Sequence, residues 1–369
     1  MKLFIFGATG DLVKKKVFPA LEEIKNLEII SLGRKDLDND LFNSEYCINC
    51  SNELKNRLNY KKISFKDNFC KECIDLIDKD KINYFYVSLP PKMAYSIIKE
   101  LIELKKQDYK IKILLEKPFG DSLKEAKNLN ELIIKGGIKE DIYLSDHYLF
   151  KDEILNLNNL FLNNKTEDKI NKNNLKKIEI VSLEKDGINQ RVYYDEVGAI
   201  KDMVQSHLLN ILFKIINLRS NNLNNIDFSD IKSSFKIKDV KIAQYKDYQK
   251  EIGKYSDTET YAKISGDLKI TDKKKDKNCK KESIEIILET GKKLEKKEAW
   301  ISLYYDRINK DFNKIELKDL KNPYIKMFND FFNGNKENFP KISQSLITWE
   351  LTEDILKYIK KKKLKLEKY

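Results

Sequence analysis

Only two histidines occur among the 369 residues of the chain, and both stand in polar surroundings. His147 lies in LSDHYLFKDE, close to Asp146, Tyr148 and Lys151, and His207 lies in IKDMVQSHLLN. An imidazole with an ordinary pKa of ~6.5 can accept a proton near neutral pH, and a neighbouring carboxylate can fix its tautomer. A structural histidine at the border of a core is the alternative for each. Because the chain has no other histidine, we interpret both as candidate residues of a catalytic site.

A glycine turn near the start of the chain, GATGDL, indicates an anion site. Apolar residues 3–6 predict a buried strand, Gly7 and Gly10 interrupt it, and a charged run then begins a helix. The unpaired N–H groups and the dipole at such a helix N-terminus favour a pyrophosphate. The third glycine of the dinucleotide fingerprint is missing, so a bare strand-to-helix turn remains the alternative.

The end of the second expected strand, IISLGRKD, indicates which dinucleotide would bind. An NAD site places Asp or Glu there for the ribose 2′-hydroxyl, whereas an NADP site places Arg beside the 2′-phosphate. Gly33 and Arg34 occupy this position, and the first acid is Asp36. The pattern predicts NADP. The alternative is that Arg34 is exposed to solvent and binds no phosphate.

Four of the five cysteines form two C-x2-C pairs, CINC at 47–50 and CKEC at 70–73. Their spacing is compatible with a structural zinc site, which we keep as an alternative. Both pairs also fit apolar helical stripes, in which cysteine serves as a small hydrophobic residue. We expect core cysteines with no bound metal and, for a cytoplasmic chain, no disulfide.

The charge and hydrophobicity of the chain limit its class. The formal net charge is +12, but the basic residues are almost all lysine, with only five arginines. We interpret the lysine-rich runs at 165–177, 271–282 and 360–369 as solvated loops and a tail, and we expect no nucleic-acid partner. No apolar run approaches the ~20 residues of a membrane span, and strand-like sequence starts at Lys2 without room for a signal peptide. We expect a cytoplasmic protein with no membrane partner.

The elements that must position these residues begin with an α/β part, residues 1–145. Strand patterns alternate there with helical ones, which predicts right-handed βαβ units and a doubly wound, Rossmann-like parallel sheet. We expect strands at 2–7, 27–33, 61–65, 83–89, 112–116 and 141–145, and helices at 12–25, 92–106 and 122–135. Ligands of such sheets bind at the carboxyl ends of the strands, where the glycine turn lies.

The second part, residues 146–369, has longer strand patterns with few helices between them. We expect strands at 176–184, 236–245, 258–264, 282–290 and 299–305, and helices at 198–218, 324–333 and 344–360. On the first of these helices an apolar stripe runs next to His207, formed by Val204, Leu208, Ile211 and Ile215. The pattern predicts an α+β domain with a large, mostly antiparallel sheet and packed helices. We expect the substrate to bind in the cleft between the two domains.

An ordered series of motifs makes the chain resemble the glucose-6-phosphate dehydrogenase family. The motifs are GATGDLVKKKVFPAL, GR, YFYVSLPP, LLEKPFG, DHYLFK, YYDEVGAIKDMVQSHLL, SDTETYA and TGKKL. They cover most of the chain, from Gly7 to about Trp349. Each motif alone is modest evidence, but their order makes the series specific. The chain is shorter than the usual members, mainly in its second part.

This resemblance implies roles for individual residues. His207 would be the general base that takes the proton from the C1 hydroxyl of the sugar, and Asp146 would orient it. The implied ligands of the sugar and its 6-phosphate are Lys117, His147, Tyr148, Lys151, Glu184, Asp202, Lys292 and Lys297. The implied cofactor contacts are Gly7, Thr9, Gly10, Asp11, Lys16, Arg34, Leu89, Pro90 and Lys117. The bond from Lys117 to Pro118 is expected to be cis.

The resemblance also implies the reaction and the assembly. It indicates an NADP-dependent enzyme of the pentose phosphate pathway that oxidises glucose 6-phosphate to 6-phosphogluconolactone, and it indicates a homodimer. One alternative is a related oxidoreductase of unphosphorylated sugars, against which Lys151, Lys292 and Lys297 argue because they match phosphate ligands. The other is a non-catalytic nucleotide- or nucleic-acid-binding descendant, against which the two retained histidines argue.

Overall fold

The chain divides into two compact units, which are described separately here. The first unit comprises Met1–Phe150 and Leu320–Ile342, and the second comprises Lys151–Asp319 and Ser343–Tyr369. The computed structural model describes residues 1–64, 69–162, 175–189, 191–219, 228–270, 282–305, 312–318 and 320–369. Most of the lysine-rich runs at 165–177 and 271–282 therefore lie outside the described residues.

The first unit is built on the parallel sheet that the alternating pattern predicts. Its strand order is β3-β2-β1-β4-β5-β6, and every neighbouring pair is parallel. The strands are β1 (Lys2–Phe6), β2 (Glu28–Gly33), β3 (Leu58–Lys62), β4 (Asn83–Val87), β5 (Ile111–Leu115) and β6 (Ile142–Leu144). β4 is buried along its whole length, as expected for a central strand that helices cover on both faces. This strand order is that of a dinucleotide-binding sheet, and the predicted Rossmann-like fold is confirmed.

Some helices of the first unit begin at a side-chain cap. Asp38 accepts a hydrogen bond from the N–H of Leu41 at the start of α2, and Ser122 accepts one from Glu125 at the start of α6. The helices are α1 (Phe18–Leu21), α2 (Asn39–Tyr46), α3 (Asn52–Lys55), α4 (Phe69–Cys73), α5 (Pro91–Lys106), α6 (Leu123–Lys135) and α12 (Pro323–Phe332). The helix expected at 12–25 ends at Leu21, and its part Val13–Val17 is π-helical.

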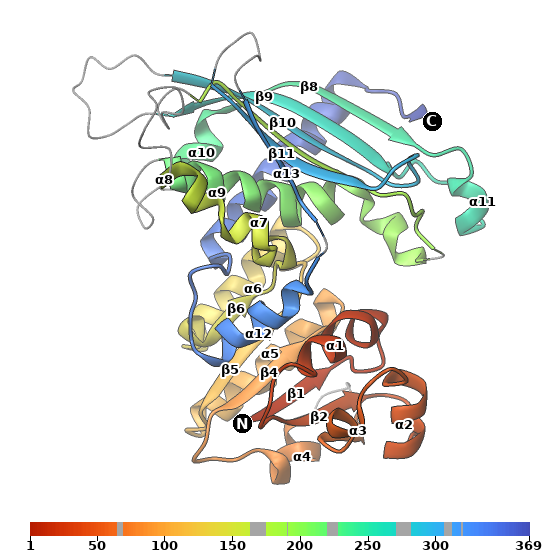
Figure 1. Ribbon diagram of the computed structural model, residues 1–369, viewed down its shortest axis with the longest axis vertical. Helices are drawn as coiled ribbons and strands as arrows, with labels where there is room; N and C mark the ends of the chain where they lie inside the picture. The colour runs from red at the N-terminus through yellow and green to blue at the C-terminus, as the bar shows by residue number, and fades with distance from the viewer. Residues whose placement is uncertain are drawn as a thin grey trace. The chain divides into compact units, whose positions relative to one another are not determined.

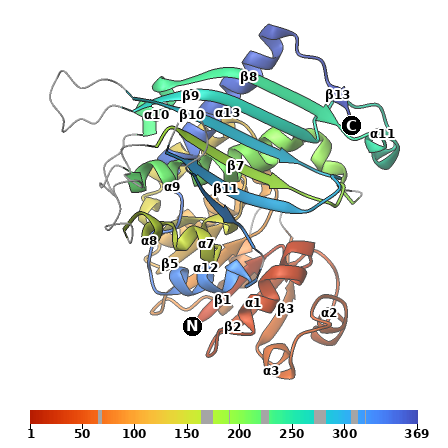
Figure 2. The same ribbon diagram turned by 45° about the horizontal axis from the view of Figure 1, so that its top comes forward.

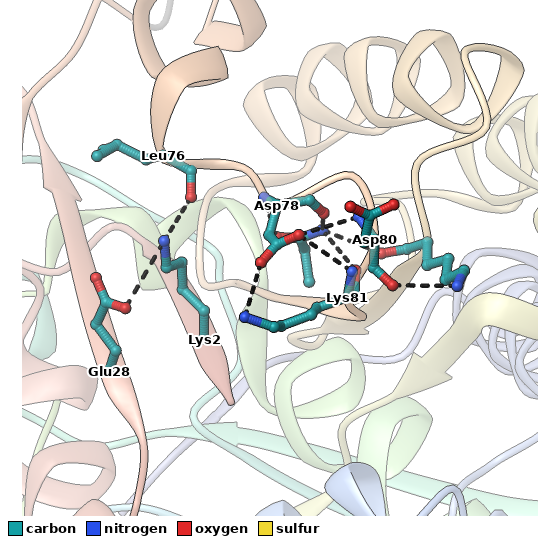
Figure 3. Close-up of polar contacts among 8 residues, drawn as sticks. Lys2, Glu28, Leu76, Asp78, Asp80 and Lys81 are labelled. Atoms are coloured by element: carbon teal, nitrogen blue, oxygen red, sulfur yellow. Dashed lines mark hydrogen bonds and ion pairs between the residues drawn. The ribbon is translucent and has the colours of Figure 1, made fainter.

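Polar contacts lie at the amino end of β1 and in the segment that leads into β4 (Figure 3). The Lys2 ammonium donates to the carbonyl of Leu76 at 2.8 Å. Asp78 accepts the backbone N–H groups of Asp80 at 3.0 Å and Lys81 at 3.2 Å. The Lys81 side chain and these amides lower the pKa of the Asp78 carboxyl. These contacts lie at the edge opposite the carboxyl ends of the strands, so their role is to anchor the sheet.

The second unit is built on a mostly antiparallel sheet, as predicted. Its strand order is β12-β11-β7-β10-β9-β8-β13, with parallel pairing only between β10 and β7 and between β13 and β8 among the described strands. The strands are β7 (Lys177–Leu183), β8 (Phe235–Gln244), β9 (Tyr261–Ile270), β10 (Glu282–Gly291), β11 (Glu298–Tyr304), β12 (Phe312–Glu316) and β13 (Glu367–Lys368). Figure 2 shows strands β8 to β11 and β7 side by side. β12 and β13 have no counterpart in the sequence-based expectation.

Helices α9, α10 and α13 lie along one face of this sheet (Figure 1). The helices of the unit are α7 (Asp152–Leu155), α8 (Leu157–Leu162), α9 (Leu209–Arg219), α10 (Phe228–Ser234), α11 (Tyr248–Ile252) and α13 (Ile342–Lys362). The predicted apolar stripe is confirmed as core, because all four of its residues, Val204, Leu208, Ile211 and Ile215, are buried. No helix in the described part of the chain has both the length and the apolar character needed to cross a bilayer.

The C-terminal lysine-rich run, residues 360–369, is mostly exposed as predicted, but it is part of a helix and a strand and not of an unstructured tail. α13 extends to Lys362, and β13 then pairs in parallel with β8. The hydroxyl of Tyr369 donates to the carbonyl of Lys292 at 2.6 Å, and its ring packs on a cluster that includes Tyr245. Long-range pairing and an aromatic anchor therefore order a segment whose composition is typical of solvent-exposed sequence.

The boundary between the units differs from the one that the change of pattern predicts. We predict domains at 1–145 and 146–369, whereas the compact units divide after Phe150, and Leu320–Ile342 returns to the first unit. The returning segment contains α12, which packs against α1 and the 3₁₀ turn His147–Phe150. The assignment of a cofactor domain and a substrate domain stays a prediction.

Candidate functional site

The glycine turn after β1 is a close approach of backbone to backbone. Gly7 has φ of +81°, and a Cβ there would lie 2.3 Å from the carbonyl oxygen of Ser88. The N–H of Gly10 donates to the carbonyl of Gly7 at 2.9 Å, which closes the turn. Leu89 packs over the same place, since its Cδ2 would be 3.3 Å from that Cβ. Only glycine fits this position, because a side chain would collide with the backbone of Ser88 where the carboxyl ends of β1 and β4 meet.

The end of β2 carries an exposed cationic edge. Arg34 is exposed and makes no hydrogen bond or ion pair with any residue that the structure describes. The ammonium of Lys35 lies 5.2 Å from the centre of the Tyr46 ring, and a hydrogen bond with Tyr46 raises the pKa of Lys35. Thr9 lies beside this edge. A Cβ added to Gly33 would be 3.2 Å from Cγ2 of Thr9. A guanidinium without an internal partner can donate hydrogen bonds to an external phosphate.

The remaining predicted cofactor residues are more dispersed. Pro90 is exposed and immediately precedes α5. Asp11 is exposed and pairs with Lys15, one turn along the helix, at 3.0 Å. Lys16 is also exposed, and its backbone carbonyl accepts a hydrogen bond from Asn322. The structure thus brings Gly7, Gly10 and Leu89 together, and it places Asp11 and Lys16 on the outside of the first helix.

Asp146 organises the turn that follows β6. It is 1% exposed, and its Oδ1 accepts the N–H of Tyr148 at 3.1 Å. Its carbonyl accepts the N–H of Leu149 at 3.0 Å. The ring of His147 is tilted against Tyr148, with centroids 5.0 Å apart, and stacks on Tyr324 with centroids 6.0 Å apart. The predicted Asp146, His147 and Tyr148 therefore form one ordered group.

Lys117 stands at the end of β5. The Lys117–Pro118 bond is cis, as expected. The backbone N–H of Lys117 donates to Oε2 of Glu116 at 3.2 Å, within its own turn. Neither Glu116 nor Tyr324 was among the candidate residues. The sequence offered one signal for Glu116, its place directly before the lysine of the EKP motif.

His207 lies on the helix expected at 198–218, in a part of it that is π-helical. The π-helical segment is Ile200–Leu208, and α9 continues from it. His207 is 1% exposed. Because i→i+5 bonding aligns residues five apart, Asp202 stands one turn before His207 on the same face. The Ser206 hydroxyl donates to the carbonyl of Asp202 at 2.5 Å, within this wider turn.

Glu259, from the SDTETYA motif, holds the start of this π-helix. Its Oε1 accepts the N–H of Ile200 at 3.0 Å, and its carbonyl accepts the N–H of Ala199 at 3.0 Å. Burial raises the pKa of Glu259. A carboxylate at a helix N-terminus also meets the positive end of the helix dipole. The sequence analysis gave Glu259 no role, although the motif that contains it was noted.

Lys292 is the centre of a buried charged cluster in the second unit. It is 3% exposed, and its ammonium lies 2.6 Å from Glu184 and 3.6 Å from Asp202. The same ammonium lies 5.2 Å from the centre of the Tyr194 ring. These contacts bring three of the predicted substrate residues together and add Tyr194, which the sequence analysis missed.

Tyr194 has a buried hydroxyl with no hydrogen-bond partner among the described residues. Burial and the nearby charge of Asp202 raise the pKa of Tyr194 well above its usual value. Lys151 is buried at the start of α7, and Lys297 is exposed in the turn before β11. Lys292 and Lys297 therefore differ in environment although they share one turn.

The cysteines correct two expectations. Cys47 ends α2 and Cys50 precedes α3, so they do not share a helical stripe, and a disulfide joins them. Cys73 is a buried free thiol, and burial raises its pKa to about 11. The described residues contain no group of three or more ligands that could hold a metal ion. A metal-free protein stays a prediction.

Comparison with known proteins identifies the family. Residues 4–156 match the family model described as "Glucose-6-phosphate dehydrogenase, NAD binding domain", and residues 157–323 match "Glucose-6-phosphate dehydrogenase, C-terminal domain". The glucose-6-phosphate 1-dehydrogenase of Buchnera aphidicola subsp. Acyrthosiphon pisum is 30% identical over 83% of this chain and 70% of its own length. The chain belongs to the glucose-6-phosphate dehydrogenase family. As a member of this family it is an oxidoreductase that uses a nicotinamide dinucleotide.

Further relatives agree with this membership. The glucose-6-phosphate 1-dehydrogenase of Helicobacter pylori strain 26695 is 29% identical over 96% of this chain and 92% of its own length. A solved glucose-6-phosphate dehydrogenase in complex with glucose 6-phosphate shares the fold, with a TM-score of 0.80 at 21% identity over 100% of this chain and 93% of that chain. A myo-inositol dehydrogenase from Corynebacterium glutamicum resembles the fold less closely, with a TM-score of 0.61 at 14% identity over 97% and 96% of the two chains.

Proposed function

We propose that this chain oxidises glucose 6-phosphate at C1 to 6-phosphogluconolactone and transfers the hydride to NADP, the first step of the oxidative pentose phosphate pathway. The observation that carries the proposal is the match to both family domains. The matched residues, 4–156 and 157–323, include every candidate residue from Gly7 to Lys297. A chain that had kept only nucleotide binding would not need the second domain.

The cofactor part of the proposal is NADP bound at the carboxyl ends of β1 and β2. The bare backbone at Gly7 suits a pyrophosphate, and the exposed Arg34 without a described partner suits a 2′-phosphate. Thr9, Gly10, Leu89 and Pro90 would line the same end of the sheet, and Asp11 and Lys16 would act from the first helix. When bound, NADP supplies the nicotinamide that accepts the hydride.

The substrate part assigns the sugar phosphate to the turn after β6 and to the residues around Lys292. His147, Tyr148 and Lys151 would bind the 6-phosphate, because a phosphate dianion gains charge-assisted hydrogen bonds from such donors. Glu184, Asp202, Lys292 and Lys297 would bind the sugar hydroxyls and the phosphate, and Lys117 would lie between sugar and nicotinamide. The cluster around Lys292 supports this assignment, because its two carboxylates can accept hydrogen bonds from sugar hydroxyls and its ammonium can donate them.

His207 is the proposed general base. One ring nitrogen would accept the proton of the C1 hydroxyl while the hydride leaves C1, and Asp146 would hold the other nitrogen and stabilise the imidazolium. Its near-complete burial supports this role, since a base shielded from water keeps its proton transfer directed to the substrate. The proposal also includes a cytoplasmic location and a homodimer. Sedimentation of the purified protein would test the homodimer.

Appearance of NADPH with purified protein, glucose 6-phosphate and NADP tests the function directly. Glucose is the matched control substrate, because it lacks only the phosphate. Equal oxidation of both sugars would favour an oxidoreductase of unphosphorylated sugars, and binding of NADP without turnover would favour a non-catalytic descendant.

Replacing the base provides the sharper test of mechanism. His207→Asn is expected to lower turnover by roughly 10²–10⁴-fold, the contribution of a positioned general base, with little change in the Michaelis constant for the sugar phosphate. The matched control is His147→Asn, which should act mainly on that Michaelis constant because it removes a binding contact. Near wild-type turnover in His207→Asn would refute the assignment.

A further inference from the structure

A buried carboxylate, Glu116, stands directly after β5 and accepts three hydroxyl groups on one oxygen. Its Oε1 accepts from Tyr86 at 2.7 Å, from Ser145 at 2.8 Å and from Tyr324 at 3.0 Å. Glu116 is 6% exposed. A buried carboxylate is costly unless hydrogen bonds satisfy it, and these three donors satisfy it.

The three donors come from separate elements of the first unit. Tyr86 lies at the carboxyl end of β4, Ser145 directly follows β6, and Tyr324 lies in the first turn of α12. Burial and then the charge of Glu116 raise the pKa values of Tyr86 and Tyr324 well above the usual range. Both phenols therefore stay protonated and donate their hydrogen bonds to Glu116.

The carboxylate also stands next to the proposed sugar-phosphate residues. Its Oε2 accepts the backbone N–H of Lys117 at 3.2 Å. Ser145 is followed by Asp146, whose carboxylate caps the turn that carries His147. The ring of Tyr324 stacks on the ring of His147 at an interplanar angle of 15°.

We propose that Glu116 is a positioning residue for the sugar phosphate, and that Tyr324 transmits this positioning to His147. The inference rests on the proposed function, because it concerns the substrate of that same site. Well-packed apolar residues often stabilise a core as well as buried charged groups do, so stability alone does not explain a carboxylate at this place. The polar network is therefore explained by geometry, because one carboxylate held in a fixed position determines the positions of Lys117, Asp146 and His147.

The docking of α12 does not depend on the Tyr324 hydroxyl alone. The side chain of Asn322, which caps the helix, donates to the carbonyl of Lys16 at 2.7 Å. At the other end of the helix the hydroxyl of Tyr84 donates to the carbonyl of Phe332 at 3.2 Å. Tyr84 lies on β4, the strand that also carries Tyr86. Tyr84→Phe therefore removes one tyrosine hydroxyl between β4 and α12 without touching Glu116, which makes it a matched control.

Steady-state kinetics of Tyr324→Phe and Tyr84→Phe test the proposal. Tyr324→Phe is expected to raise the Michaelis constant for glucose 6-phosphate roughly 3–10-fold, the equivalent of one ordinary hydrogen bond. Turnover and the Michaelis constant for NADP should stay within about twofold, because substrate binding is the step affected. Tyr84→Phe should leave all three quantities unchanged. Equal effects of the two variants, or no effect of Tyr324→Phe, would overturn the proposal.

Nuclear magnetic resonance of the histidine rings separates this proposal from the proposed function. Because the chain has only two histidines, the ring signals of His147 and His207 can be assigned by substitution. Tyr324→Phe should shift or broaden the signals of His147 and leave those of His207 in place, whether or not the protein oxidises glucose 6-phosphate. Unchanged His147 signals in Tyr324→Phe would overturn the positioning role. If the signals shift as expected but the wild-type protein does not oxidise glucose 6-phosphate, the result would count against the proposed function alone.

Discussion

Removal of the buried ammonium of Lys292 should destabilise the protein measurably. Lys292→Met keeps an unbranched side chain of similar length and removes the charge. It leaves Glu184, whose carboxylate lies 2.6 Å from the ammonium, and Asp202, at 3.6 Å, facing each other without their cation. Breaking a buried ion pair on one side typically costs about 3–5 kcal/mol, because a charge stays buried without a partner.

The exposure of the two carboxylates reduces this magnitude. The side chain of Glu184 is 30% exposed and that of Asp202 is 14% exposed, so water relieves part of the loss. We expect a loss of about 2–3 kcal/mol in the free energy of unfolding. For a cooperative unit of about 200 residues this corresponds to a melting temperature lower by roughly 4–12 °C.

Differential scanning calorimetry near neutral pH, without ligands, measures the effect. Lys293→Met is the matched control, since Lys293 is the next residue and its ion pair with Asp247 is exposed, with side-chain exposures of 44% and 69%. Exposed pairs contribute at most about 1 kcal/mol. The double variant Lys292→Met/Glu184→Gln should regain part of the stability that Lys292→Met loses. Equal melting temperatures for Lys292→Met and Lys293→Met would refute the reasoning.

Three further predictions concern the cofactor, the π-helix and the buried thiol. Arg34→Ala should raise the Michaelis constant for NADP by roughly 10–100-fold and leave that for NAD nearly unchanged, because only the contact to the 2′-phosphate is lost, and equal losses for both cofactors would count against it. Burial raises the pKa of Glu259 above its ordinary value of 4.5, so the folded state binds that proton more tightly and loses stability as pH rises through the raised pKa. Thermal melts at several pH values should therefore show Glu259→Gln gaining on the wild type from about pH 4.5 upward, and a constant difference would contradict this. Cys73, with its pKa raised to about 11, should react with iodoacetamide at pH 8 roughly a hundredfold more slowly in the folded protein than in the unfolded chain. Mass spectrometry of the peptide that contains Cys73 measures both rates, and equal rates would show that the thiol is accessible.

The sequence by itself determined the features that depend on near neighbours. Alternation of short apolar strands with helical patterns was sufficient for the parallel sheet, because burial on both faces requires this composition. The turn at Gly7 was readable for the same kind of reason, since a positive φ and a close backbone approach exclude other residues. Arg34 could be placed at the end of β2 because a strand end follows directly from the apolar pattern.

Tertiary structure alone decided the features that join distant segments. The return of α12 to the first unit brings Tyr324 to Glu116, a contact between residues 208 positions apart that no periodicity encodes. Glu259 accepts the N–H of Ile200 at the start of the π-helix that carries His207, and it comes from a segment about 60 residues further along the chain. β13 has a composition typical of solvent-exposed sequence, yet its pairing with β8 orders it. In each case the deciding free energy comes from packing and hydrogen bonds between remote parts of the chain, which local propensity does not contain.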